Sequence, residues 1–542
     1  MQKNLFGEIE VMSLSIEEAA KKANVSTASI RNWVKTGYLS QISKGKVDLE
    51  SFSSFMTNVA GNEKLTQRAN KLMKDEHDHA ALSSFVKNHD GSKSWEVIGH
   101  EYEGSLSNSY RNKEGIYYTP LEIIDNMLEE VAIESNTTFL DPCCGSGNFI
   151  IQAIKKGIQP ENVFGFDFDA NAVEITRKRI FQETGFDASH NIKKVDFLED
   201  ALELKNERKY NLIFTNPPWG KKIAKKEKER FAMTYGAGTS IDTTSLFYFA
   251  SYNLLKKDGF LGFLVQDALF NIGTFQDTRK HILQNELIRL IDYGKPFKGL
   301  LTKAYAFILR KNKTPNISVS CEDVNAKRNR NQATFSKTPK NILNFWVTKE
   351  ESEVIEHIFS LPHTTLSGKA KWGLGIVTGN NSKFCKETHK SGYVPVFKGS
   401  DITTKGLKEP TNFIPNDFLQ YQQVAPLNLY RAGEKLLYKF ISSKLVFYCD
   451  TQQRFILNSA NFLIPSKSLN INCQQLADLL SSDLMNWLFG SLFNTHKILR
   501  GDIEQLPIHK GYFNHEISFN EKTYVNYLGL TKLENGTYRI KE

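Results

Sequence analysis

The sequence has few cysteines and no long apolar run. Its six cysteines include no Cys-x-x-Cys pair, which argues against a disulfide scaffold and a structural zinc site and fits a reducing cytoplasm. No stretch of about 18 apolar residues occurs, and the first residues contain no apolar segment before their acidic side chains. We therefore expect a cytoplasmic protein with no membrane span, no secretory signal and no bound metal.

The amino-acid composition is typical of a globular protein and has an excess of positive charge. Of its 542 residues, 40% are hydrophobic and 24% are charged, and the net charge is +9. Because this length exceeds what one hydrophobic core supports, we expect two to four domains. The positive charge permits a polyanionic partner without requiring one.

Residues 1–60 are predicted to form a small helical unit. Residues 15–23 and 27–35 each have the pattern of a short helix, with a turn at 24–26 between them. Residues 43–46 have the composition of a small wing. Two short helices joined by a tight turn form a helix-turn-helix, and this stretch resembles the units of excisionases and MerR-like regulators. A three-helix module that contacts protein stays open as the alternative, because the local charge is nearly balanced.

A predicted helical linker over 61–114 leads to a region, 115–311, in which strands and helices alternate. Amphipathic helical stretches separate most of seven apolar runs, at 138–140, 163–166, 191–195, 210–214, 260–265, 287–291 and 304–309. This alternation predicts a doubly wound, mostly parallel α/β sheet. Ligands of such sheets bind at the carboxyl ends of the strands.

The pattern loses its regularity beyond this region. Residues 312–340 contain prolines and a basic run, which indicates a linker or an exposed loop. Residues 341–542 combine short strand-like pieces with a late helix near 474–493. We expect a C-terminal domain of mixed α+β structure.

The most specific local signal follows the first predicted strand. That strand ends in Asp141, and a Gly145-Ser146-Gly147 turn then opens a helix. Glycines in such a turn let the backbone approach a ligand closely. The absence of a third glycine argues against a nicotinamide dinucleotide.

Acidic residues also end the next two predicted strands. Asp167 ends the second strand, where a carboxylate suits hydrogen bonds to ribose hydroxyls. Asp196 and Phe197 end the third, and they offer an acceptor for an adenine amine and an aromatic face for its ring. Together these positions indicate a nucleoside-containing ligand.

The fourth strand ends in Asn216-Pro217-Pro218-Trp219. The amine of a nucleobase is a poor nucleophile, because its lone pair is delocalised into the ring. The Asn216 side-chain oxygen and the Pro217 carbonyl could accept both of its N–H groups, and the prolines restrict the backbone. Trp219 offers a stacking face for a base swung out of the duplex.

Three segments in this order resemble the gamma-class adenine-N6 DNA methyltransferases of restriction-modification systems. They are Gly115-Ile116-Tyr117-Tyr118-Thr119-Pro120, Asp141-Pro142-Cys143-Cys144-Gly145-Ser146-Gly147 and Asn216-Pro217-Pro218-Trp219. The resemblance covers roughly 110–510 and is strongest over 115–220. It implies a Rossmann-like domain that binds S-adenosylmethionine over 115–311 and a target-recognition domain over 341–542.

The resemblance also implies roles for single residues. Thr119 matches the position that contacts the methionine carboxylate. The other implied cofactor residues are Asp141, Gly145, Gly147, Asp167, Asp196 and Phe197. The implied catalytic residues are Asn216, Pro217, Pro218 and Trp219. Phe297 matches a second aromatic that packs on the target base, with an ordinary core position as the alternative.

A basic segment follows the tetrapeptide. Residues 221–230 contain six basic and two acidic side chains, which predicts phosphate contacts or a solvated helix face. The candidate DNA-binding residues are Lys221, Lys222 and Lys225. Segments near 375–381, 396–402 and 493–508 resemble recognition-domain segments of the same family.

These observations predict a DNA methyltransferase that acts on adenine N6 in a specific duplex sequence. Double-stranded DNA is the expected partner, and a separately encoded restriction endonuclease is compatible with this function. The alternatives are methylation of cytosine N4, guanine in ribosomal RNA or a protein glutamine through the same tetrapeptide, and a catalytically silent DNA-binding regulator. A fused nuclease is disfavoured, because no nuclease pattern precedes residue 115.

Overall fold

A computed structural model shows how most of these segments fold. It describes residues 13–23, 27–35, 39–43, 45–58, 92–106, 114, 117–129, 131–297, 302–514 and 518–542. The predicted turn at 24–26 and residues 61–91 of the predicted linker lie outside the described residues. The chain divides into two compact units, which we describe one at a time. The first contains Met1–Thr119, Cys143–Asp196 and Pro218–Lys222, and the second Pro120–Pro142, Phe197–Pro217 and Ile223–Glu542.

The N-terminal part of the first unit is a small helical fold with a three-stranded antiparallel sheet. Its elements are β1 (Ser13–Ser15), α1 (Ile16–Lys22), α2 (Thr27–Lys35), β2 (Gln41–Ser43), β3 (Lys46–Asp48) and α3 (Leu49–Asn58). A capping box begins α1, in which Ser15 and Glu18 exchange hydrogen bonds of 2.8 and 3.1 Å. The two helices lie where the sequence predicts them, and β2 and β3 form a hairpin at the predicted wing. DNA binding by this part stays a prediction.

The described residues in the rest of the first unit form two parallel strands and three α-helices. They are α5 (Trp95–Ser105), α8 (Asn148–Lys155), β5 (Val163–Asp167), α9 (Ala170–Thr184) and β6 (Ile192–Lys194). Ile98, Tyr102 and Leu106 recur every four residues and form a buried cluster with Ile175 of α9. Within the linker predicted over 61–114, the residues of α5 therefore form a helix that packs against α9.

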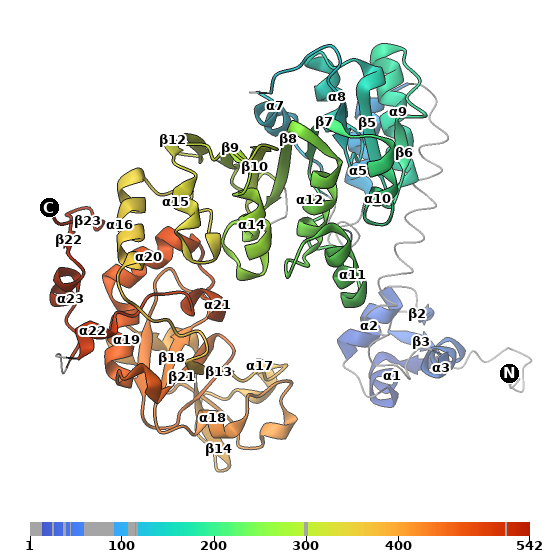
Figure 1. The fold of residues 1–542 in the computed structure, drawn as a ribbon. Coiled ribbons are helices and arrows are strands. Elements are labelled where there is room, and N and C mark those ends of the chain that lie inside the picture. Colours follow the sequence, from blue (N-terminus) through green and yellow to red (C-terminus); the bar gives the residue numbers. More distant parts are fainter. Residues whose placement is uncertain are drawn as a thin grey trace, which may run out of the picture. The chain divides into compact units, whose positions relative to one another are not determined.

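The second unit contains a large sheet in which five of the seven strands run in one direction. Its order is β12-β11-β9-β10-β8-β7-β4, and β10 and β12 run against the others. The strands are β4 (Phe139–Asp141), β7 (Tyr210–Thr215), β8 (Leu255–Gln266), β9 (Glu286–Asp292), β10 (Ala304–Arg310), β11 (Val319–Glu322) and β12 (Lys327–Arg330). The mostly parallel α/β architecture agrees with the prediction (Figure 1).

Helices of the second unit cover this sheet. They include α7 (Leu121–Met127), α10 (Phe197–Glu207), α11 (Lys225–Tyr235), α12 (Thr243–Leu254), α13 (Ala268–Asn271) and α14 (Gln276–Ile282). Ten of the twelve residues of α12 are buried, because α12 contacts α10, α11, α14 and β8. Apolar side chains around its whole circumference are typical of such a central position.

The prediction that residues 312–340 form a linker or an exposed loop is wrong over β11 and β12. These two strands pair with each other, and β11 also pairs in parallel with β9. Arg330, which the sequence places in a basic exposed run, is only 2% exposed. The sequence of β12 is Lys-Arg-Asn-Arg, which lacks the apolar alternation that predicts a strand.

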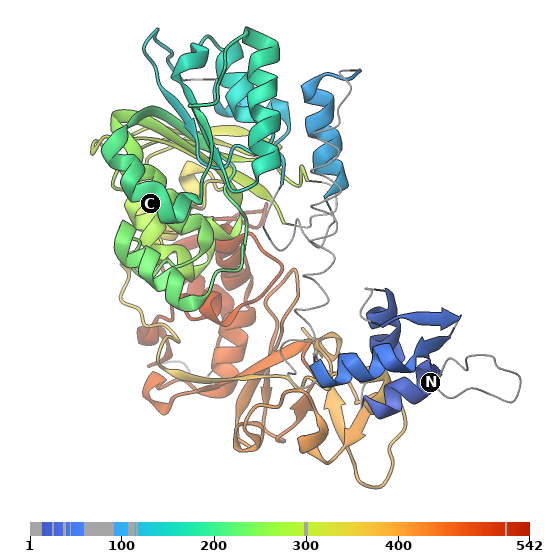
Figure 2. The same cartoon turned by 90° about the vertical axis from the view of Figure 1, so that its right-hand side faces the viewer.

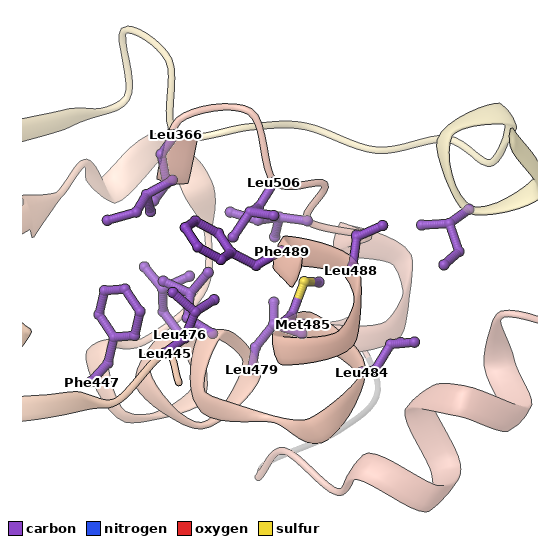
Figure 3. Packing of buried hydrophobic residues seen from close by; sticks show 14 of the residues in the cluster. Leu366, Leu445, Phe447, Leu476, Leu479, Leu484, Met485, Leu488, Phe489 and Leu506 are labelled. Atoms are coloured by element: carbon purple, nitrogen blue, oxygen red, sulfur yellow. The ribbon is translucent and has the colours of Figure 1, made fainter. Parts of the chain in front are cut away.

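The described residues in the C-terminal part of the second unit form four small sheets, two of them two-stranded, and a large helical core (Figure 2). One sheet contains β13 (Ala370–Leu374), β21 (Ala460–Pro465), β18 (Lys435–Lys439) and β19 (Phe447–Asp450), and another β17 (Asn412–Pro415), β14 (Tyr393–Phe397) and β20 (Phe455–Ile456). Leucines, Phe447, Phe489 and Met485 interdigitate in the core (Figure 3). The core buries side chains of α16 (Lys349–Ser360), α19 (Cys473–Ser481) and α20 (Asp483–Phe493).

The late helix predicted near 474–493 is two helices. Ser482 between them has an extended backbone, with φ −63° and ψ 156°, as is usual for a residue that caps a helix, and its hydroxyl accepts from the Met485 amide. A serine that caps α20 therefore ends the preceding helix. Within the described residues, no helix is both long and apolar enough to cross a bilayer.

Candidate active site

The Gly-Ser-Gly turn of the first unit requires its glycines. Gly145 and Gly147 have φ of 51° and 90°, which other residues rarely adopt. A Cβ atom on Gly145 would lie 2.9 Å from the Tyr118 ring, and one on Gly147 would lie 2.8 Å from Thr176. The turn lies beside the end of β5, where the Gly145 amide donates to Asp167.

Asp167 at the end of β5 accepts two backbone hydrogen bonds. Its Oδ2 atom accepts from the Gly145 amide at 2.8 Å, and its Oδ1 atom accepts from the Asp169 amide at 2.9 Å. Burial raises the pKa of its carboxyl from 3.8 to about 6, although these two bonds act in the opposite direction. A carboxylate oxygen accepts more than one hydrogen bond, so Asp167 can also accept from a ligand hydroxyl.

Helix α5 supplies polar contacts to this turn that the sequence analysis missed. Glu103, only 8% exposed, accepts a hydrogen bond from the Ser146 hydroxyl, and the buried Tyr102 hydroxyl donates to Asp169. Gly99 faces the same serine, since a Cβ atom at this position would lie 3.2 Å from Ser146 Cβ. The available signal was the apolar spacing of four residues from Ile98, which marks one buried face of a helix.

Residues of α8 and α9 also hold the turn. Arg179 Nη1 donates to the Ser146 carbonyl at 2.6 Å and to Asn148 Oδ1 at 2.7 Å, and Thr176 donates to the Gly145 carbonyl at 2.8 Å. The side-chain amide of Asn148 donates through Nδ2 to the backbone carbonyl of Thr119 at 3.2 Å. The structure therefore joins Thr119, a predicted site residue, to the Gly-Ser-Gly turn.

An exposed aromatic ring lies directly after Asp167. Phe168 is 56% exposed, and the Lys221 ammonium lies 4.8 Å from the centre of its ring. Lys221 also pairs with Glu114 at 3.4 Å. Asp196 is exposed, whereas Trp219 is only 3% exposed and packs against Tyr117 with 5.6 Å between the ring centres. Phe168 is a further residue that the sequence analysis did not single out.

In the second unit, the ends of β4 and β7 lie side by side. The two strands pair in parallel, with Leu140 opposite Ile213, so Asp141 and Asn216 follow the same edge of the sheet. Asp141, 1% exposed, accepts a hydrogen bond from Thr215 at 2.6 Å. Thr215 directly precedes Asn216 and ties the start of the tetrapeptide to this aspartate.

The remaining candidates of the second unit have different surroundings. Phe197 is buried and stacks on Phe247 with 5.5 Å between the ring centres. Phe297 is 8% exposed, and Pro217 is buried while Asn216 is half-buried. The described residues contain no group of three or more histidine, cysteine, aspartate or glutamate side chains placed to hold a metal ion.

Most of the predicted basic loop is a helix. Lys222 is exposed before the helix, and Lys225 begins α11, where it pairs with Glu229 at 3.6 Å. Arg230 of the same helix pairs with Glu199 of α10. Such exposed pairs contribute little to stability.

Comparisons with known proteins identify the family of this chain. The model of the N-6 DNA methylase family matches residues 93–362, and the model of the TaqI-like C-terminal specificity domain matches residues 394–508. The type II methyltransferase M.VspI of Vibrio sp. (strain 343) is 49% identical over 411 residues, which span 75% of this chain and all of that protein. The chain belongs to the N-6 DNA methylase family. It is a DNA methyltransferase of the restriction-modification type.

More distant proteins share parts of this methyltransferase. The adenine-specific methyltransferase PglX of Lacticaseibacillus casei (strain Zhang) is 22% identical over 222 residues, which are 36% of this chain and 18% of that protein. The solved structure of the DrdV-DNA complex has a TM-score of 0.50 at 13% identity and covers 92% of this chain and 69% of that chain. The likeness to DrdV shows the fold alone.

Proposed function

We propose that this methyltransferase transfers a methyl group from S-adenosylmethionine to N6 of an adenine swung out of duplex DNA. The observation that supports this proposal most directly is the position of the tetrapeptide. It begins at Asn216, at the same edge of the sheet as Asp141, the last residue of β4. The name of PglX, an adenine-specific relative over part of the chain, supports adenine as the target. Thr119, Asp141, Gly145, Gly147, Asp167, Asp196 and Phe197 are the proposed cofactor residues.

The residues of the first unit fit this cofactor. The turn around Gly145 and Gly147 presents backbone where a Cβ atom would collide with neighbouring side chains, and Asp167 is a buried acceptor beside it. A ribose hydroxyl suits this carboxylate, and the exposed ring of Phe168 suits a flat base. S-adenosylmethionine supplies the methyl group from its sulfonium sulfur when bound.

The tetrapeptide prepares the target amine. Asn216 Oδ1 and the Pro217 carbonyl accept the two N–H groups, which favours a tetrahedral nitrogen whose lone pair is available for bonding. Pro217 and Pro218 limit the backbone motion that would misplace these acceptors. Trp219 and Phe297 are the proposed stacking partners of the extruded base. Catalysis in this scheme depends on orientation and hydrogen bonding.

The other parts of the chain have proposed roles around this centre. Lys221, Lys222 and Lys225 contact phosphates next to the extruded base. Residues 341–542, which include the TaqI-like specificity domain, read the target sequence, and residues 1–60 act as a helix-turn-helix that adds DNA contacts. A separately encoded restriction endonuclease would share the same target sequence.

The proposed reaction is tested by expressing the full chain in a host without DNA methylation. Sequencing that distinguishes N6-methyladenine from N4-methylcytosine is expected to find N6-methyladenine at every copy of one short sequence. N4-methylcytosine at that sequence would overturn the choice of adenine. Unmodified DNA, together with label from methyl-tritiated cofactor in RNA or protein, would overturn DNA as the substrate.

The pKa of Asp167 predicts how cofactor binding depends on pH. The ionised carboxylate is the stronger acceptor for a ribose hydroxyl, and its pKa is about 6 in the structure. Lowering the pH from 7 to 5 protonates it, so calorimetry is expected to show about a tenfold weaker cofactor Kd. Asp167→Asn is expected to bind more weakly at pH 7 and to lose this dependence.

A matched control separates this effect from general acid sensitivity. Asp187 is an exposed aspartate whose pKa lies below its usual value because of bonds from Ser189. Asp187→Asn is expected to keep the pH profile of the unmodified protein. An Asp167→Asn protein with an unchanged Kd and pH profile would remove Asp167 from the ribose role.

A further inference from the structure

The turn between β19 and β20 in the specificity domain has a strained backbone at an exposed glutamine. Gln453 has φ of 56°, a conformation that glycine and asparagine adopt more readily than glutamine. It is exposed, so burial does not explain the choice of residue. Strain of this kind persists where the surrounding structure holds it, and it is frequent at functional positions.

A buried charge network holds this turn. Asp450 has a fully buried side chain that accepts hydrogen bonds from the buried Lys435, from Arg454 Nη1 at 2.8 Å and from the amide of Arg454 at 2.9 Å. It also accepts from the Gln452 amide at 3.2 Å. Removing these charges from water costs free energy. We take the presence of this buried network beneath one short exposed turn as an indication that the conformation of the turn is important for function.

The same network fixes Arg454 beside the turn. Its second guanidinium nitrogen donates to Gln452 Oε1 at 2.7 Å, and its guanidinium lies 5.7 Å from the centre of the Phe397 ring and 5.8 Å from that of Tyr448. Arg454 and Gln452 are thus bound to each other. The side chain of Gln453, at the tip of the turn, takes part in none of these contacts.

The turn lines a groove of about 420 Å³ together with β14 and the segment after β16 (Gly406–Leu407). Lys408, Glu409 and Arg454 are the charged residues that line the groove. The stretch 383–408, which includes β14, contains six lysines and two acidic residues. This excess of positive charge complements a phosphate backbone, and the groove lies within the residues matched by the specificity-domain model.

We propose that Gln453 reads a base edge of the target sequence in duplex DNA, with Asp450, Lys435, Gln452 and Arg454 as its positioning residues. A glutamine amide has a donor and an acceptor that match N7 and N6 of adenine in the major groove. Lys408, the lysine that lines the groove, contacts a phosphate, which carries no sequence information. This inference rests on the proposed function, in which residues 341–542 read the target sequence.

The test replaces Gln453 by glycine in the full chain. Gln453→Gly removes the side chain and relieves the backbone strain at a positive φ, so its thermal stability is expected to equal or exceed that of the unmodified protein. Sequencing of host DNA for methylated bases is expected to show the same target sequence with one position relaxed. In steady-state assays, discrimination at that position is expected to fall about tenfold to hundredfold.

Two further results decide the inference. Gln474→Ala, in which an exposed glutamine that bonds Asp478 on its own helix is removed, is expected to keep the original target sequence. An unchanged target sequence in Gln453→Gly would overturn the inference, and so would a uniform loss of affinity for all sequences, which indicates a phosphate contact. If the unmodified chain methylates no DNA, the proposed function itself fails, which is distinguishable from both results.

Discussion

Asn216→Ala is expected to lower the rate of methyl transfer by about 100- to 1,000-fold, the usual effect of removing one preorganised hydrogen-bonding group at a reacting atom. The side chain lies at the edge of the sheet where β7 ends, and in the proposed reaction it contacts the target amine and not the cofactor. The Kd of the cofactor is therefore expected to stay within a few-fold. Methyl transfer from labelled cofactor and calorimetry measure the two quantities.

Two further variants sharpen this test. Asn216→Asp keeps an acceptor oxygen and is expected to retain more activity than Asn216→Ala. Asn535→Ala changes an exposed asparagine in the turn between β22 (Leu530–Lys532) and β23 (Tyr538–Ile540), whose side chain accepts only local bonds from Thr537, and is expected to be fully active. An Asn216→Ala protein with more than about a tenth of normal activity would contradict the proposed role of the tetrapeptide.

The parts of the fold that the sequence predicts well depend on local signals. All seven runs of 115–311 became strands, and six of them are apolar segments. The exception is β6, in which two exposed lysines follow Ile192. The short string from Asp141 to Gly147 forms the predicted turn because two of its positions have backbone angles that favour glycine. Such features lie within a few neighbouring residues and can be recognised without tertiary structure.

The parts that the sequence did not reveal depend on contacts between distant segments. Glu103 is 43 residues from Ser146 along the chain, and the polar sequence around it is equally compatible with an exposed helix. The network of Lys435 and Asp450 likewise joins two strands. A charged residue that is buried with a partner resembles an exposed one in the sequence, since burial of charge requires a partner that local patterns do not identify.

Arg330→Met is expected to destabilise the second unit by about 4 kcal/mol or more. The Arg330 side chain donates to the carbonyls of Asn344 and Val347 at 3.3 and 3.0 Å, and to the hydroxyls of Thr334 and Ser352 at 2.9 and 2.6 Å. Burial lowers the pKa of its guanidinium to about 10, so it stays protonated at neutral pH. Methionine fills the space but leaves these buried acceptors without their donor, which costs about 1–3 kcal/mol for each group left unsatisfied.

Thermal unfolding followed by circular dichroism measures this effect, and a decrease in Tm of roughly 5–10 °C is expected. Arg310→Met is the matched control, because Arg310 is 40% exposed and its carboxylate partners Asp258 and Glu286 lie 3.8 and 3.9 Å away. Exposed pairs of this kind contribute less than about 1 kcal/mol, so its Tm is expected to change little. Equal decreases in Tm in the two variants would show that the hydrogen bonds of Arg330 do not hold β12 against residues 344–352. Residues 312–340 would then behave as the linker that their sequence suggests.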